Sequence, residues 1–188
     1  MKTNLVLWVG AAMIGGIAVN ASCATYPETS AKTVVSSVIT KNQNDDAPFV
    51  KEAVDRSMYE VEIGKLALKK AISSQVQEFA KMMVDDHTNV KTDLKALATR
   101  KKIVTPGAIT QSQQQQLTAL MAKSGQDFDR QYLSYVRAEH QKTVDIFKKA
   151  AENAKDADIK AFAAKTLPRM LYHLEMIDRL EKLTADSN

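Results

Sequence analysis

Three histidines are the side chains of this chain best suited to chemistry, and each lies in an otherwise apolar helical pattern. His87 follows Met83 by one helical turn and precedes Val90 by three residues, so its imidazole should point into the protein. His140 and His173 occupy the same kind of position in two later segments. Because an ionisable group in a protein core needs a partner, the chemistry depends on what the three imidazoles meet.

Glu60 is the fourth candidate, because it is the one carboxylate in a stripe of small residues that runs from Ala53 to Ala71. With the three histidines it would provide three nitrogen ligands and one oxygen ligand. Such a set suits Zn²⁺, and Cu, Fe or Ni can also use it. Met83 and Met170 each lie one turn from a histidine, and their thioether sulfur would instead favour copper. The cofactor under this interpretation is one transition-metal ion: Zn, Cu or Fe.

A buried hydrogen-bond network is the alternative to a metal site, and it is the preferred interpretation of the sequence. In it the imidazoles would pair with Glu60, with Asp86 or with a tyrosine such as Tyr132. Satisfied buried polar groups of this kind can fix how helices align. Glu62 lies on the neighbouring face of the same helix and is the second choice for the carboxylate. Both interpretations stay open.

Patterns for other catalytic chemistry are missing from the sequence. The single cysteine, Cys23, lies near the N-terminus, and there is neither a Gly-x-Ser-x-Gly motif nor a glycine-rich phosphate loop. Di-iron sites in helical bundles use Glu-x-x-His, but the residues three positions before the histidines are Val84, Arg137 and Met170. An enzyme is therefore not favoured, and a mononuclear metalloenzyme with an open coordination position remains an alternative.

Four long amphipathic segments must position these residues, and strand patterns are almost absent. Their apolar residues recur every three or four positions, which marks one face of an α-helix. The helices are expected at about residues 48–71, 74–101, 112–154 and 156–183. Pro48 suits a first helical turn, and Ser124 with Gly125 can interrupt the third helix.

Pro168 has two interpretations in the last helix. It either kinks one continuous helix and so aims His173, or it stands in the first turn of a second helix, which is preferred. Asp127 and Asp129 follow the Gly125 interruption, where acidic side chains complement the positive end of a helix dipole. We expect both to act as N-terminal charges of the helix that follows.

The connections between the helices predict the topology. Two of them are short, and a longer one contains Pro106 and Gly107, which together indicate an all-α, up-down-up-down four-helix bundle over residues 48–184. In that order the first and third connections lie at the same end. Counted from there at 1.5 Å per residue, the four candidate ligands lie within roughly 7 to 8 Å along the bundle axis. They should therefore be able to meet.

The N-terminus predicts export. Lys2 precedes an apolar run over residues 5–19, and small residues follow, which is typical of a secretory signal over residues 1–23. Cys23 follows Ser22 and is either the lipidated first residue of a lipoprotein or is lost on cleavage after Ala24. The slightly preferred lipid would anchor the protein to a membrane, and an uncleaved signal would do the same.

The polar residues 24–47 are expected to form a flexible tether between that anchor and the bundle. The predicted location is the periplasm or the outer membrane. The charge is nearly balanced, with 26 Lys and Arg against 22 Asp and Glu. The nearest basic cluster, Arg100 to Lys102, lies at a helix end where cations complement the dipole. A nucleic-acid partner is therefore not expected.

Several short motifs resemble, in their order and spacing, one bacterial family. They are Phe49-Val50, Glu60 to Gly64 with Ala67, Phe79-Ala80, Met83-Val84, Asp86-His87, Gly125, Phe128-Asp129, Tyr132, His140, Leu167-Pro168 and His173. The family is labelled predicted outer membrane protein, a domain of unknown function grouped with the ferritin-like bundles. The resemblance implies a ferritin-like bundle in the cell envelope and brings no established activity.

The sequence thus predicts an exported cell-envelope four-helix bundle with a binding or structural role, for example in stress. The first alternative is a bundle that stores, buffers or senses a transition metal through Glu60, His87, His140 and His173. The second alternative is the metalloenzyme. A metal count on the purified protein separates the first interpretation from the other two.

Overall fold

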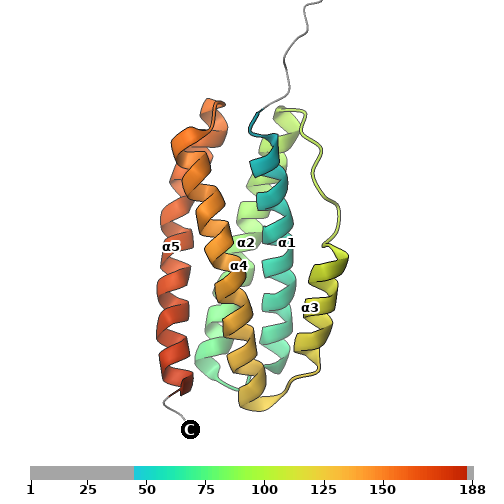
Figure 1. Ribbon diagram of the computed structural model, residues 1–188, viewed down its shortest axis with the longest axis vertical. Helices are drawn as coiled ribbons and strands as arrows, with labels where there is room; N and C mark the ends of the chain where they lie inside the picture. Colours follow the sequence, from blue (N-terminus) through green and yellow to red (C-terminus); the bar gives the residue numbers. More distant parts are fainter. Residues whose placement is uncertain (1–44, 186–188) are drawn as a thin grey trace, which may run out of the picture. The chain divides into compact units, whose positions relative to one another are not determined.

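The computed structural model describes residues 45–185, which form five α-helices and no strand (Figure 1). These helices are α1 (Ala47–Lys70), α2 (Ser74–Arg100), α3 (Gln111–Met121), α4 (Gly125–Asn153) and α5 (Ala157–Ala185). The all-helical prediction is confirmed. The predicted signal peptide, Cys23 and most of the tether lie outside the described residues. Within residues 45–185, no helix combines the length and the apolar character needed to cross a membrane.

Local signals set most helix ends within two residues of the prediction. Pro48 stands in the first turn of α1, and the Ser73 side chain caps α2 by accepting from the Val76 N–H. Helix α5 continues through Pro168, so the preferred interpretation of Pro168 as the start of a second helix is wrong.

The third predicted helix is in fact two helices, α3 and α4. Thr110 begins α3 with a capping box, in which it exchanges hydrogen bonds with Gln113. After Met121 the chain reverses, and Gly125 has a φ of 59°, which glycine adopts more easily than other residues. Helix α4 therefore runs back along the bundle, antiparallel to α3 (Figure 1).

This reversal makes the predicted up-down-up-down order wrong. Helices α1 and α2 form one antiparallel hairpin, and α4 and α5 form the other. The long connection with α3 returns the chain to the far end of the bundle before α4 starts, so α4 runs parallel to α2 (Figure 1). The turn between α1 and α2 and the turn between α4 and α5 consequently lie at opposite ends.

Each hairpin turn is held by an aspartate of the other hairpin. Asp129 on α4 is buried and accepts hydrogen bonds from the backbone N–H of Ile72 (3.2 Å) and Ser73 (2.9 Å). At the other end, Asp46 accepts from the N–H groups of Lys155 (2.8 Å) and Asp156 (2.7 Å). Asp129 thus caps the α1–α2 turn and not α4, which corrects the sequence interpretation.

Replacing Asp129 by alanine should lower the free energy of unfolding by about 2 to 3 kcal/mol. Two N–H groups of the α1–α2 turn lose a charged acceptor, and hydrogen bonds to charged groups are worth about 1.5 to 3 kcal/mol. Urea unfolding followed by circular dichroism measures the change. Asp127→Ala is the matched control, since this aspartate is exposed and pairs only locally with Arg130, and about 0.5 kcal/mol or less is expected. Equal losses in both variants would contradict the prediction.

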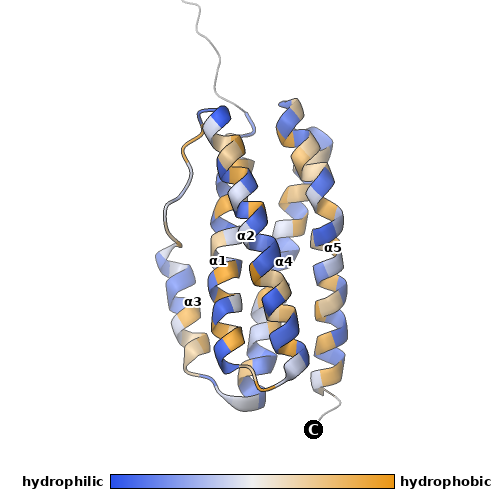
Figure 2. Cartoon of the chain, turned by 180° about the vertical axis from the view of Figure 1, so that it is seen from behind, coloured by the Kyte–Doolittle hydropathy of each residue, from blue (hydrophilic) through white to orange (hydrophobic). Residues whose placement is uncertain are grey.

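The core consists of two apolar clusters, and hydrophobic and hydrophilic residues alternate along each helix that encloses them (Figure 2). One cluster lies towards the α1–α2 turn and includes Phe79, Phe128 and Leu180. The other lies towards the α4–α5 turn and includes Val54 and Phe147. A layer of buried polar side chains separates the two clusters.

Gly64 of α1 packs directly against α2. A Cβ atom at this position would lie 2.7 Å from Cγ2 of Val84, a β-branched side chain with little freedom to move. Gly64→Ala should therefore destabilise the protein by roughly 1 to 2 kcal/mol in urea unfolding, although alanine is normally the better helix residue. Gly107→Ala is the control, because a Cβ there meets nothing within 4 Å. A stabilising Gly64→Ala change would contradict the packing argument.

Candidate metal centre

The polar layer is built from the middles of the four long helices. Glu60 is residue 14 of the 24 in α1, His87 is 14 of 27 in α2, His140 is 16 of 29 in α4 and His173 is 17 of 29 in α5. The structure brings all four together. Because each lies near the middle of its helix, they reach the same height whichever way a helix runs. The wrong helix order therefore did not affect their convergence.

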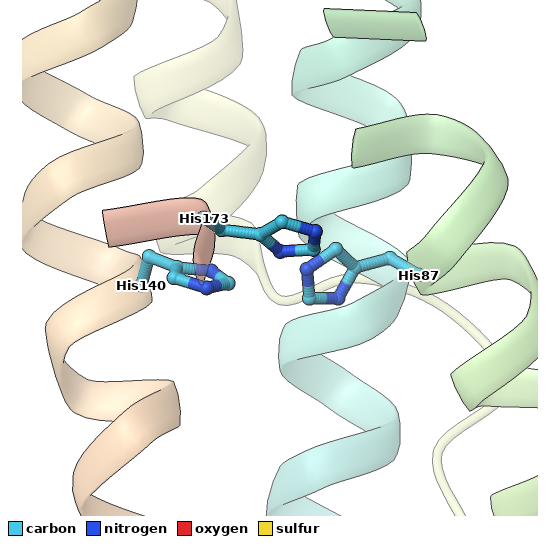
Figure 3. Close-up of side chains that lie close together, drawn as sticks. All are labelled: His87, His140 and His173. Carbon is cyan, nitrogen blue, oxygen red and sulfur yellow. The ribbon is translucent and has the colours of Figure 1, made fainter. Parts of the chain in front are cut away.

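The three imidazole rings point towards one another across the bundle axis (Figure 3). Their ring centroids are 5.1 to 5.5 Å apart, and all three side chains are fully buried. One ring nitrogen from each histidine lies within 4.8 Å of the other two. At such separations the three nitrogens can turn towards one metal ion after small adjustments.

Glu60 supplies a buried negative charge to the layer. Its Oε1 accepts hydrogen bonds from Nδ1 of His140 (3.1 Å) and from the hydroxyl of Thr143 (3.2 Å). Burial alone would raise the pKa of Glu60, but the charges of His87 and His140 and their contacts lower this pKa well below its usual range. Glu60 is therefore a carboxylate.

Both ring nitrogens of His140 face oxygen acceptors. Its Nε2 donates to the backbone carbonyl of Met170 (3.0 Å), and its Nδ1 faces Oε1 of Glu60. Both of these oxygens are acceptors, because the ionised Glu60 has no proton to donate. The layer thus contains a buried ion pair between His140 and Glu60.

His173 is the neutral imidazole of the layer. Its Nε2 donates to Oδ2 of Asp86 (2.8 Å), and the guanidinium of Arg169 donates to the same oxygen (2.7 Å). Burial lowers the pKa of His173 to about 3; the charges of His140 and His87 act in the same direction, and Asp86 opposes them. With its proton on Nε2, His173 has a lone pair on Nδ1, which has no hydrogen-bond partner among the described residues.

His87 has neither ring nitrogen in a hydrogen bond within residues 45–185. Its Nδ1 lies 2.7 Å from Oε2 of Glu60, a contact that is not aligned as a hydrogen bond, so Oε2 has no hydrogen-bond partner among the described residues either. Buried polar atoms are normally satisfied, and an unsatisfied group usually marks a site for water or an ion. The predicted pairs are present, since His87 and His140 contact Glu60 and His173 contacts Asp86. These pairs still leave both ring nitrogens of His87 and Nδ1 of His173 without a hydrogen bond among the described residues.

The other residues selected from the sequence divide into two groups. Asp86 contacts His173 and supports the layer. Glu62 pairs with Lys65 at the surface, with 44% of its side chain exposed, and lies outside the layer. Tyr132 is buried beside apolar residues, and burial raises the pKa of its hydroxyl, which has no hydrogen-bond partner in the described part of the chain.

The two methionines flank the layer as core residues. Met83 belongs to one apolar cluster and Met170 to the other, so packing accounts for both side chains. Met170 contributes to the layer through its carbonyl oxygen, which accepts from His140. The thioether argument for copper therefore receives no support from the contacts described.

Sequence reasoning missed three participants: Thr143, Arg169 and the Met170 carbonyl. Thr143 lies three residues after His140 on the same face, so its spacing was a usable signal. Arg169 lies next to Pro168, and half of its side chain is exposed. Nothing in the sequence pattern therefore indicated that it contacts the buried layer. A backbone carbonyl is present at every residue, so no sequence pattern could select the one of Met170.

The described residues define an all-helical bundle with a buried centre of three histidines and supporting carboxylates. The chain belongs to the family described as Domain of unknown function (DUF4142), which matches residues 33–180. The predicted family of unknown function is thereby confirmed. Comparisons with curated proteins and with solved structures found no match.

Proposed function

We propose that this protein binds one first-row transition-metal ion through His87, His140 and His173, with Glu60 as the accompanying carboxylate. The observation that carries the proposal is His173, a neutral buried imidazole beside two further imidazoles, whose Nδ1 lone pair has no hydrogen-bond partner within residues 45–185. Neutral imidazole is a preferred ligand of Zn²⁺ and also binds Cu, Fe and Ni.

The groups around the histidines support this proposal. A histidine that binds a metal usually donates its other N–H to a carboxylate or to a backbone carbonyl. His173 donates to Asp86, and His140 donates from Nε2 to the Met170 carbonyl. Ligation by Nδ1 of His140 requires the loss of its proton, and the charge of the cation would then replace the proton charge beside Glu60.

We further propose a role in metal storage, buffering or sensing in the cell envelope. The apolar run over residues 5–19 and Cys23 support export and lipid anchoring. Burial of all four candidate ligands suits retention of an ion more than turnover of a substrate. The single long connection between two hairpins supports a ferritin-like fold, but the Glu-x-x-His ligands of di-iron centres are missing from the sequence.

Elemental analysis tests the proposal. The exported protein is purified without a histidine tag and without chelator, and metal is counted per chain. Titration of the stripped protein with Zn²⁺, Co²⁺, Cu²⁺ and Fe²⁺ then follows by calorimetry. About one equivalent of a single metal is expected. Protein that contains no metal and takes up none of the four ions would overturn the proposal.

That negative outcome would favour a structural role for the layer. The specific observation behind this second candidate is the ion pair between His140 and Glu60, which satisfies both ring nitrogens of His140. The layer would then fix the height of the four helices relative to one another. Removing the layer would then change the alignment of the helices, and no bound ligand would be lost.

A further inference from the structure

Asp86 links the buried layer to solvent. The three histidine side chains and the Glu60 side chain have no exposed surface, whereas 20% of the Asp86 side chain is exposed. The same Asp86 oxygen that accepts from His173 also accepts from Arg169, half of whose side chain is exposed. A continuous polar path therefore runs from solvent through Asp86 to His173.

The opposite side of the layer has no comparable path among residues 45–185. Thr143 connects Glu60 to Glu139, but it does so through the backbone carbonyl of Glu139. The Glu139 carboxylate turns outward and pairs with Arg56 (2.9 Å) and Lys142 (2.8 Å). Asp86 is thus the carboxylate in the described part of the chain that contacts both the layer and solvent.

We propose that Asp86 is the entry ligand of the metal site and that Arg169 keeps this entry closed. The inference rests on the proposed function. A cation arriving between α2 and α5 first meets Asp86, which must leave Arg169 before the ion can move past it to Nδ1 of His173. Arg169 neutralises the carboxylate and repels cations, and its position is supported by the ring of Tyr172, 5.5 Å away. It therefore slows both uptake and release.

The test compares rates of metal exchange. Stripped full-length mature protein is mixed with Co²⁺, and uptake is followed by stopped-flow absorbance; release is followed after addition of excess chelator. Arg169→Gln should speed uptake and release by a similar factor of roughly ten, with the dissociation constant nearly unchanged. Asp86→Asn keeps an acceptor for His173 but loses the charge, so uptake should slow by roughly tenfold.

Matched controls separate this effect from a change in overall charge. Arg137→Gln removes an arginine that also pairs with carboxylates on α5 and is similarly exposed. Asp85→Asn removes the neighbouring aspartate, which pairs with Lys81 at the surface. Both controls should exchange Co²⁺ at the wild-type rate.

Each outcome of the experiment decides the inference. If wild type binds one ion, and Arg169→Gln and Asp86→Asn exchange it no differently from their controls, the entry role is wrong and the metal site stands. If wild type binds no ion, the proposed function and the entry role fail together. Circular dichroism checks folding, and if Asp86→Asn does not fold, the half-exposed Arg169→Gln variant decides alone.

Discussion

Replacing His87 by leucine is expected to abolish metal binding and to destabilise the metal-stripped protein modestly. The change removes one of the three imidazole ligands. It also removes the Nδ1 that lies 2.7 Å from Oε2 of Glu60 and helps to keep that carboxylate ionised, so a loss of roughly 1 to 3 kcal/mol is expected in the stripped protein. Elemental analysis and Zn²⁺ titration measure the first effect. Urea unfolding in the presence of chelator measures the second.

The combination of these two results distinguishes the metal site from a structural network. In a purely structural network, wild type would bind no metal, and His87→Leu would change stability alone. Leu171→Ala on α5 is the control for metal binding, since Leu171 is partly exposed at the surface. A His87→Leu variant that still binds one equivalent of metal with wild-type affinity would remove His87 from the site.

Replacing Glu60 by leucine is expected to lower the free energy of unfolding by roughly 3 to 5 kcal/mol. The change leaves His140 without its carboxylate partner in a fully buried position. Removing one partner of a buried ion pair typically costs this much, because the remaining charge is uncompensated. Urea unfolding of the stripped protein, followed by circular dichroism, measures the loss.

A control and a double substitution make this second prediction specific. Glu62→Leu changes the same residue type on α1 at an exposed position, and a loss below about 1 kcal/mol is expected. Adding His140→Leu to Glu60→Leu removes the stranded charge, so the pair should lose less stability than the sum of the two single variants. Losses that simply add would argue against the buried ion pair.

The sequence by itself determined the helices and the residues that they bury. Helix ends follow local signals such as Pro48 and the Ser73 cap, and inward faces follow from the 3.6-residue repeat. Each histidine occupies an apolar stripe near the middle of its helix. The three imidazoles therefore meet Glu60 at the same level along the bundle axis. These properties depend on interactions within a few residues, and sequence spacing records them directly.

The tertiary structure decided the direction of α4 and the partners within the layer. At Ser124 and Gly125 the chain can either continue a helix or reverse, and packing of α4 against α1 and α5 selects the reversal. The same packing brings Asp129 to the α1–α2 turn and Asp86 to His173. Such contacts join residues more than fifty positions apart, so their existence depends on how whole helices are placed and not on local spacing.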